Sequence, residues 1–382
     1  MESQKNKYWL HILLFILTVL TTTFSGAELM FGKLSYFTQF LFEVPQDAIL
    51  STDQLWQGLH YSIPFLAILT VHEFGHYFTA KYYQLRVSLP FYIPMWLGFL
   101  GFGLSIGTMG AFIQIKSQMQ SNKEFFDVGI AGPLAGFVVA IAILFYGFTN
   151  LPPAEYIFTI HPEYKIYGLD YAQFVYKNME GQTRLGTNLL FEFFKNYVAD
   201  PKLLPHDNEM MHYPYLLAGY FALFFTALNL MPIGQLDGGH ILYGLLGYKK
   251  HKIISFVLLT IFVFYAGLGL FRPIDELNYL AYAPVYITFL YFLFSRVFES
   301  KISNLLTALS VFALQFTVSY FFPNLQGYHG WLLFAFILGK VLGISHPVAE
   351  VEKPLDWKRQ VLGWISLLIF ILSFTPQVIV LE

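Results

Sequence analysis

Nine long apolar stretches constrain the fold of this chain more than any other feature of its sequence. A helix needs about 20 mostly apolar residues to cross a bilayer, and seven of the stretches have 19 residues or more. The stretches are residues 8–26, 59–82, 125–150, 213–231, 253–271, 277–298, 302–322, 330–342 and 361–375. Only 12% of the 382 residues are charged, whereas soluble domains average about 25%. We therefore expect an all-α polytopic membrane protein with about nine transmembrane helices.

Basic residues predict how these helices are oriented, because cytoplasmic loops carry an excess of Lys and Arg. With a cytoplasmic N-terminus, 15 of the 22 basic residues fall on the cytoplasmic side. The first stretch ends in Ser25-Gly26-Ala27, so a cleaved signal peptide is the alternative to the retained anchor helix that we expect. We expect a location in a bacterial inner membrane, in contact with the lipid bilayer. The net charge of −2 indicates no nucleic-acid partner, and the sequence does not predict the oligomeric state.

Two regions between the apolar stretches do not have the pattern of a spanning helix. Residues 86–117 are apolar but contain two prolines and five glycines, and residues 111–115 have the pattern of a short strand. Since irregular backbone at membrane depth must be buried in protein or line a cavity, we expect a short membrane-embedded β-hairpin or re-entrant segment. Residues 151–212 form a polar insertion that we expect outside the cytoplasm, with a helix near residues 188–198.

The second apolar stretch contains a candidate metal-binding motif, His72-Glu73-Phe74-Gly75-His76. Residues four apart share one face of a helix, so His72 and His76 can present their imidazoles to one metal ion. Glu73 can take a proton from a water on that metal. Ionisable groups inside a membrane helix are costly unless they are functional or paired. The motif therefore predicts a metal centre, and the absence of cysteine leaves His and carboxylate side chains as ligands.

Asp237 is the candidate third ligand. A catalytic zinc ion takes three protein ligands and keeps one position for water. Asp237 follows Pro232 and Gly234, which interrupt the fourth apolar stretch, and the predicted orientation places both His76 and Asp237 in the cytoplasmic half of the bilayer. The alternative is that Asp237 is only a helix N-cap.

These motifs resemble those of the site-2 protease family of intramembrane zinc metalloproteases. The resemblance lies in HEFGH at residues 72–76, GTMGAF at residues 107–112, GIAGPLAG at residues 129–136 and NLMPIGQLDGGH at residues 229–240. It implies one zinc ion per chain on His72, His76 and Asp237, with Glu73 as the general base. It also implies that Asn229 is a catalytic residue that donates a hydrogen bond to the developing oxyanion or to the substrate backbone.

The function that the resemblance implies is hydrolysis of a peptide bond in or near a transmembrane segment of a membrane protein. This would be regulated intramembrane proteolysis with the active site toward the cytoplasm, and residues 86–117 would hold the substrate by strand addition. A PDZ domain, present in some family members, is not expected. The alternative function is a metal-ion transporter that uses the same His and Asp side chains but needs no Glu73.

The motifs also predict a division of the chain into three parts. These are an N-terminal anchor helix and outer segment (residues 1–56), a protease core (residues 57–247) and accessory transmembrane helices (residues 248–382). Three further features have structural interpretations. We expect Gly132 and Gly136 to allow close helix packing, Asp127 to be a helix cap, and His346 to be an ordinary loop histidine. His240, three residues after Asp237, is a candidate for an alternate metal ligand or for a residue that hydrogen-bonds to a metal ligand.

Overall fold

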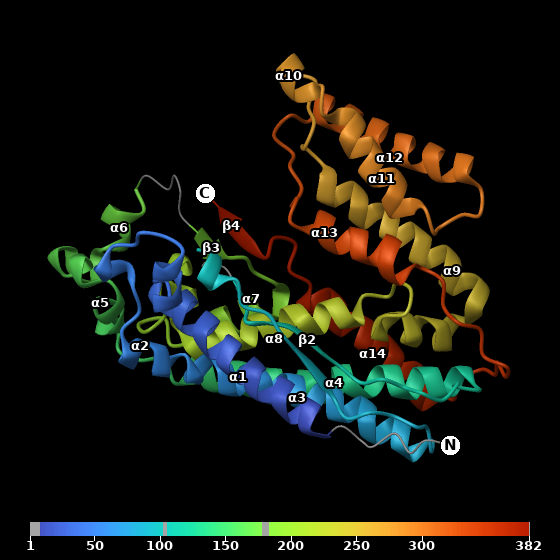
Figure 1. Cartoon of the computed structure of the whole chain (residues 1–382), viewed down its shortest axis with the longest axis horizontal. Helices are drawn as coiled ribbons and strands as arrows, with labels where there is room; N and C mark the ends of the chain where they lie inside the picture. The colour runs from blue at the N-terminus through green and yellow to red at the C-terminus, as the bar shows by residue number, and fades with distance from the viewer. Residues whose placement is uncertain (1–7, 102–104, 178–182, 382) are drawn as a thin grey trace. The chain divides into compact units, whose positions relative to one another are not determined.

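The computed structural model describes residues 8–101, 105–177 and 183–381. Within these ranges the chain is mostly helical, with two small sheets of two antiparallel strands each (Figure 1). The longer helices are α1 (Tyr8–Phe31), α3 (Leu59–Tyr82), α4 (Asn122–Thr149), α7 (Leu189–Tyr197), α8 (Pro214–Leu230), α9 (Asp237–Gly267), α11 (Ala283–Phe294), α12 (Lys301–Phe321) and α14 (Trp357–Ser373).

Shorter elements connect these helices. The short α-helices are α2 (Thr52–Gln57), α5 (Ile157–Ile160), α6 (Ala172–Val175), α10 (Leu277–Leu280) and α13 (Trp331–Phe336), the last continued by a π-helical turn, η7 (Ile337–Leu342). The 3₁₀ segments are η1 (Tyr36–Phe40), η2 (Gln46–Ala48), η3 (Gly98–Leu100), η4 (Ala154–Tyr156), η5 (Pro162–Asp170) and η6 (Asp207–His212). The strands are β1 (Phe91–Pro94), β2 (Thr108–Phe112), β3 (Thr183–Leu185) and β4 (Ile379–Leu381).

Five helices among the described residues are long and apolar enough to cross a membrane, so the chain is an integral membrane protein. They are α1, α4, α9, the combined segment Leu277–Phe294, and α12. Two shorter apolar helices are α8 and the segment Trp331–Leu342. All nine apolar stretches fall on helices. The start of α9 differs from the prediction, because the helix begins at Asp237 rather than at residue 253 and is broken at Gly247, where φ is 76°.

The described residues form two compact units. The first contains the residues up to 118, residues 131–228 and the residues from 368 onward; the second contains residues 119–130 and 229–367. Each unit therefore collects segments that are far apart in the sequence.

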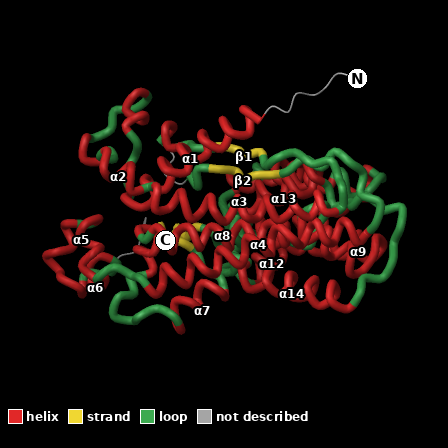
Figure 2. Tube along the Cα trace, turned by 90° about the horizontal axis from the view of Figure 1, so that it is seen from below, coloured by secondary structure: helices red, strands yellow, loops and turns green. Residues whose placement is uncertain are grey.

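In the first unit, β1 and β2 form the hairpin expected within residues 86–117 (Figure 2). Phe91 pairs with Phe112 and Tyr92 pairs with Ala111, with an irregular register before Pro94. The second strand begins at residue 108, three residues earlier than predicted. Gly107 precedes it with φ at 91°, and a Cβ at this position would lie 2.4 Å from the Cα of Thr22 in α1. Glycine is therefore needed where the hairpin meets α1.

The polar insertion in the first unit contains the predicted helix as α7. The side chain of Asn188 caps this helix by accepting a hydrogen bond from the backbone N–H of Phe191, at 2.9 Å. Strand β3 of the insertion pairs with β4, so the last described residues lie beside the insertion (Figure 1). The buried hydroxyl of Tyr220 in α8 donates a hydrogen bond of 2.6 Å to the carbonyl oxygen of Val378, next to this sheet.

The second unit is held together by polar contacts as well as apolar packing. Asp127 does not act as a simple helix cap. Its two carboxylate oxygens each accept a hydrogen bond of 2.7 Å from the guanidinium of Arg359 at the start of α14. The cap prediction was wrong because the partner lies 232 residues away in the sequence. In the apolar part of the unit, the buried amide of Gln315 in α12 donates to the carbonyl oxygens of Val263 and Phe264 in α9.

Candidate metal centre

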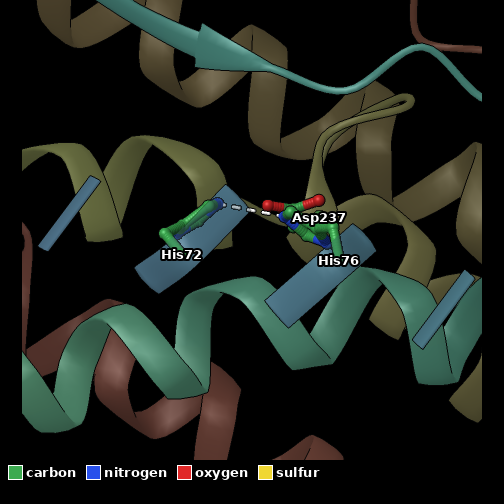
Figure 3. A group of neighbouring side chains, drawn as sticks. All are labelled: His72, His76 and Asp237. Atoms are coloured by element: carbon green, nitrogen blue, oxygen red, sulfur yellow. Dashed lines mark hydrogen bonds between the residues drawn. The ribbon is translucent and has the colours of Figure 1, made fainter. Parts of the chain in front are cut away.

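His72 and His76 project from one face of α3, one helical turn apart (Figure 3). Their Nε2 atoms lie 3.0 Å apart, and one ring donates a hydrogen bond to the other. Both side chains are buried. Two ligands on a tetrahedral zinc ion with bonds of about 2.0–2.1 Å are separated by roughly 3.3 Å. The two Nε2 atoms are thus close to the spacing that one metal ion requires, and a buried imidazole pair is a donor set that fits zinc.

Glu73 lies next to this pair. Glu73 is only 4% exposed, and its Oε1 atom is 4.0 Å from the Nε2 atom of His72. A metal ion would bind where the two Nε2 atoms converge. A carboxylate in this position can reach a water molecule bound to that ion. The structure therefore places the predicted base beside the predicted ligands.

Glycines on α4 allow this helix to approach the histidines. A Cβ at Gly132 would lie 2.1 Å from the Nε2 atom of His76, and a Cβ at Gly136 would lie 3.0 Å from the Cβ of His72. On the opposing helix, a Cβ at Gly75 would lie 2.6 Å from the carbonyl oxygen of Ala131. The prediction of close packing is confirmed. The packing also has a consequence for the site, because it puts both imidazoles against the backbone of α4.

Strand β1 is attached to α3 just before the motif. The hydroxyls of Thr70 and Tyr92 lie 2.8 Å apart and share a hydrogen bond. Tyr92 also packs with Leu66 and Leu69 of the same helix. The hairpin is therefore tied to the turn of α3 that immediately precedes His72.

Asp237 is the first residue of α9, and the N-cap position belongs to Leu236. The predicted alternative, in which Asp237 is the N-cap, is therefore wrong. A Cβ at Gly238 would lie 2.0 Å from the carbonyl oxygen of Leu230, and one at Gly239 would lie 2.3 Å from that of Gly234. These glycines let the first turn of α9 fold back closely on the end of α8, which sets the position of Asp237.

The loop before Asp237 is also held by polar contacts within its unit. Gly234 has φ at 61°, and its backbone N–H donates to the hydroxyl of Ser255 at 3.3 Å. Its carbonyl oxygen accepts a hydrogen bond of 3.1 Å from the Nε2 atom of His251. Asn229 lies just before this loop, in the last turn of α8.

His72 and His76 lie in the first unit, whereas Asp237, at the start of α9, lies in the second. Two nitrogen donors and one carboxylate are a ligand set found at catalytic zinc sites. The assignment of His72, His76 and Asp237 as the three ligands stays a prediction from the sequence.

His240 and His346 form a pair in the second unit. The Nδ1 atom of His240 lies 2.6 Å from the Nε2 atom of His346. His346 is 3% exposed, and its ring stacks on Tyr243 with 4.1 Å between the centroids. Burial and the neighbouring His240 lower the pKa of His346 to about 3. The prediction of an ordinary loop histidine was wrong, because the residues that bury His346 are distant in the sequence.

Sequence reasoning missed two other groups of polar residues that are buried or partly buried. Glu28, inside α1, accepts hydrogen bonds from the indole N–H of Trp96 and the backbone N–H of Ser35. An acidic residue in an apolar helix was a signal that could have identified it. The second group is His161, Glu209 and His212 in the insertion. Glu209 and His212 are three residues apart, but His161 is 51 residues from His212, so no local motif joins all three.

Comparison with known proteins places these features in a family. The family model described as peptidase family M50 matches residues 60–268. The chain is 30% identical over 271 residues to the probable zinc metalloprotease EGY1, chloroplastic, of Oryza sativa subsp. japonica, an alignment that covers 69% of this chain and 41% of that protein. It is 27% identical over 270 residues to the Arabidopsis thaliana protein of the same name, covering 69% and 43%.

A third relative is the probable zinc metalloprotease EGY2, chloroplastic, of Oryza sativa subsp. indica. The identity is 28% over 235 residues, which cover 60% of this chain and 38% of that protein. The chain thus spans about two fifths of the length of the curated relatives it matches. No solved structure matches the chain.

Proposed function

This chain belongs to peptidase family M50, and on that premise we propose that it is an intramembrane zinc metalloprotease. The observation that supports this function best is the buried His72–His76 pair on α3 with Glu73 beside it. The proposed substrate is a membrane protein, cut in or near a transmembrane segment in regulated intramembrane proteolysis.

We propose that one catalytic zinc ion is held by His72, His76 and Asp237. The bound ion would act as a Lewis acid toward the scissile carbonyl and would make water a stronger nucleophile at neutral pH. Glu73 takes the proton from the attacking water and returns it to the departing amine. Asn229, at the end of α8, donates a hydrogen bond to the developing oxyanion or to the substrate backbone.

The β1–β2 hairpin is the proposed binding place for the substrate. A helix hides its peptide groups in its own hydrogen bonds, so a protease must bind a locally extended segment. Strand β1 packs against α1, so we assign the added strand to the edge of β2. Met109 and Phe112 on β2 are exposed and offer apolar contacts to a membrane-derived peptide. The tie between Tyr92 and Thr70 would keep this strand next to the catalytic helix.

The proposed membrane arrangement comes from the basic residues of the sequence. It has nine transmembrane helices, a cytoplasmic N-terminus and an active site toward the cytoplasmic side of a bacterial inner membrane. The protease core would be residues 57–247, between an anchor and outer segment (residues 1–56) and accessory helices (residues 248–382). The relatives named above are chloroplastic, so a chloroplast membrane is the other location to test.

The decisive experiment compares wild-type protein with Glu73→Gln. We expect Glu73→Gln to abolish the appearance of membrane-protein fragments in quantitative proteomics of cells while it leaves bound zinc unchanged. The matched control is Glu43→Gln, which changes an exposed acid and should preserve cleavage. If Glu73→Gln still cleaves, the mechanism is wrong. If wild type produces no fragments but moves zinc across proteoliposomes, the protein is a transporter instead.

A further inference from the structure

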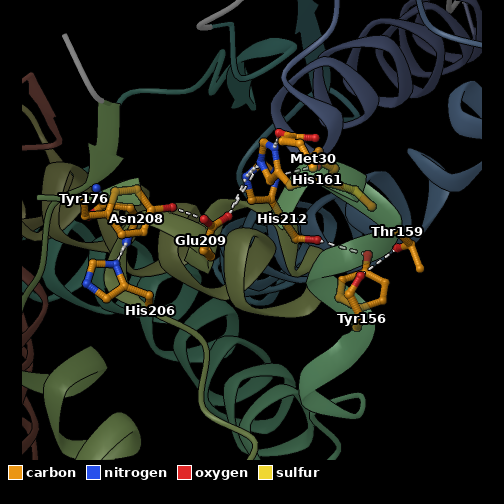
Figure 4. Close-up of polar contacts among 10 residues, drawn as sticks. Met30, Tyr156, Thr159, His161, Tyr176, His206, Asn208, Glu209 and His212 are labelled. Carbon is orange, nitrogen blue, oxygen red and sulfur yellow. Dashed lines mark hydrogen bonds and ion pairs between the residues drawn. The ribbon is translucent and has the colours of Figure 1, made fainter. Parts of the chain in front are cut away.

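We propose that the polar insertion carries a second zinc site, formed by His161, Glu209 and His212 (Figure 4). His161 directly follows α5, and the other two residues lie on η6. All three belong to the first compact unit, and none is part of the M50 motifs. The proposal does not depend on the catalytic function, because it stands on the geometry of these three side chains.

The three candidate ligand atoms have the spacing of a metal coordination shell. The Nε2 atoms of His161 and His212 are 3.4 Å apart. The Oε2 atom of Glu209 is 3.2 Å from the His212 nitrogen and 3.8 Å from the His161 nitrogen. Ligand atoms on a tetrahedral zinc ion lie roughly 3.3 Å from each other, given bonds of about 2.0–2.2 Å. One zinc ion therefore fits among the three atoms with small side-chain adjustments.

Neighbouring groups orient each ligand toward that point. The Nδ1–H of His212 donates a hydrogen bond of 2.5 Å to the carbonyl oxygen of Met30, and that of His161 donates one of 3.0 Å to Glu163 Oε1. Both neutral rings then carry their lone pair on Nε2, the atom that faces the cluster. The hydroxyl of Tyr176 donates to Oε1 of Glu209. Such contacts behind the ligands are typical of metal sites, where they set the tautomer and the ring direction.

Burial gives the strongest argument for a bound cation. Glu209 is 1% exposed, and among the described residues its Oε2 atom accepts no hydrogen bond. A buried carboxylate oxygen that accepts no hydrogen bond is costly, and a divalent cation held between this oxygen and the two imidazole nitrogens would compensate for it. The side chain of His161 is 28% exposed, which gives the ion access to the site and leaves room for a water as fourth ligand. Zinc suits two imidazoles and one carboxylate.

The position of the site suggests what it does. Met30 is in the last turn of α1, and its carbonyl holds His212, so the ion would link the insertion to the end of this helix. We infer a structural role in which the metal keeps η6 and the residue after α5 together.

The test measures zinc bound per chain in the full-length protein. Each variant is purified in detergent, loaded with Zn²⁺, dialysed against zinc-free buffer and measured by inductively coupled plasma mass spectrometry. We expect two zinc ions in wild type, one in Glu209→Gln, one in Asp237→Ala and none in the double variant. The control His60→Gln, which changes an exposed histidine, should keep two. Because Glu209→Gln removes a buried charge, the partly exposed His161→Gln provides a second test, with helical circular dichroism as the check on folding.

The outcomes separate this proposal from the catalytic one. If Glu209→Gln and His161→Gln both bind as much zinc as wild type, the second site is disproved. If Asp237→Ala binds as much zinc as wild type while Glu209→Gln loses one ion, the insertion site holds and the proposed catalytic ligand set fails. An ion pair between Glu209 and a protonated His212, with no metal, would appear as a wild-type zinc content that Glu209→Gln does not change.

Discussion

Gly132 on α4 lies directly against the imidazole of His76 on α3, and a Cβ at Gly132 would come within 2.1 Å of its Nε2 atom. The hydrogen side chain of glycine is thus a requirement for the position of a proposed zinc ligand. The same helix approaches His72 at Gly136. The close packing of α3 and α4 therefore determines where the two imidazoles lie.

We expect Gly132→Ala to lower zinc content and cleavage strongly while most of the helical structure remains. The added methyl group would clash with the His76 ring, so either the ring or the whole helix must move. Overpacking of this kind costs roughly 1–3 kcal/mol of stability. Bound zinc and fragment release measure the effect. The control is Gly147→Ala in the same helix, where the Cβ would meet its nearest neighbours at 3.1 Å. Normal zinc binding in Gly132→Ala would contradict the packing argument.

We expect Glu73→Gln to reduce the cleavage rate by about 10²–10⁴-fold, the usual contribution of a general base. The amide has nearly the same shape as the carboxylate but does not accept a proton. The rate is measured with a purified membrane substrate in proteoliposomes. Glu73→Asp provides a graded comparison: it keeps the base but shortens its reach, so it should retain more activity than Glu73→Gln. Equal losses in the two variants would contradict a proton-transfer role.

The hydrogen bond between Thr70 and Tyr92 should couple the hairpin to α3 energetically. In a double-mutant cycle of Thr70→Val and Tyr92→Phe, we expect a coupling of about 0.5–1.5 kcal/mol in the free energy of unfolding. Thermal or denaturant unfolding in detergent micelles gives this value. Tyr82→Phe removes an exposed hydroxyl and should change stability little. A coupling near zero would mean that the two hydroxyls do not hold the hairpin.

The pair of His240 and His346 should make the protein less stable in mild acid. The pKa of His346 is lowered to about 3, whereas an unfolded histidine has a pKa of about 6.5. Between these values the unfolded chain binds the extra proton, so stability is full above about pH 6.5 and falls as pH decreases toward 3. The expected loss at pH 5 is roughly 1–2 kcal/mol.

Other titratable groups face His346 and share this environment. His240 and His251 contact its ring, and Tyr243 stacks on it. We expect His346→Gln to flatten the dependence of the unfolding temperature on pH between 5 and 7.5. The exposed control His60→Gln should leave that dependence unchanged. If both variants show the wild-type slope, His346 is not the group responsible.

The zinc motif was predictable because its spacing is local. His72, Glu73 and His76 lie within two turns of one helix, so the helical period alone places both imidazoles on one face. The hairpin was predictable for a related reason, since proline and glycine exclude a regular helix in residues 86–117. The start of α9 was not predictable, because Gly238 and Gly239 lower the helix propensity of this segment. The same two glycines allow the first turn of α9 to pack on the end of α8.

Contacts between residues far apart in the sequence could not be predicted from local sequence patterns. The cluster of His161, Glu209 and His212 joins segments about 50 residues apart, and Asp127 pairs with a residue 232 positions away. In each case the local sequence is equally compatible with a common structural role, such as a helix cap or a loop histidine. Only the packing of the chain decides which partner a polar group meets.

The sequence by itself determined that this chain is a membrane protein with a metal-binding helix, because apolar length and a four-residue spacing act along a single segment. Tertiary structure decided which side chains are buried together: the imidazole of His76 against Gly132, His346 against Tyr243, and two histidines around Glu209. The physical reason is that hydrophobicity and helical period are properties of consecutive residues. Burial and ligand spacing depend on which surfaces meet in three dimensions.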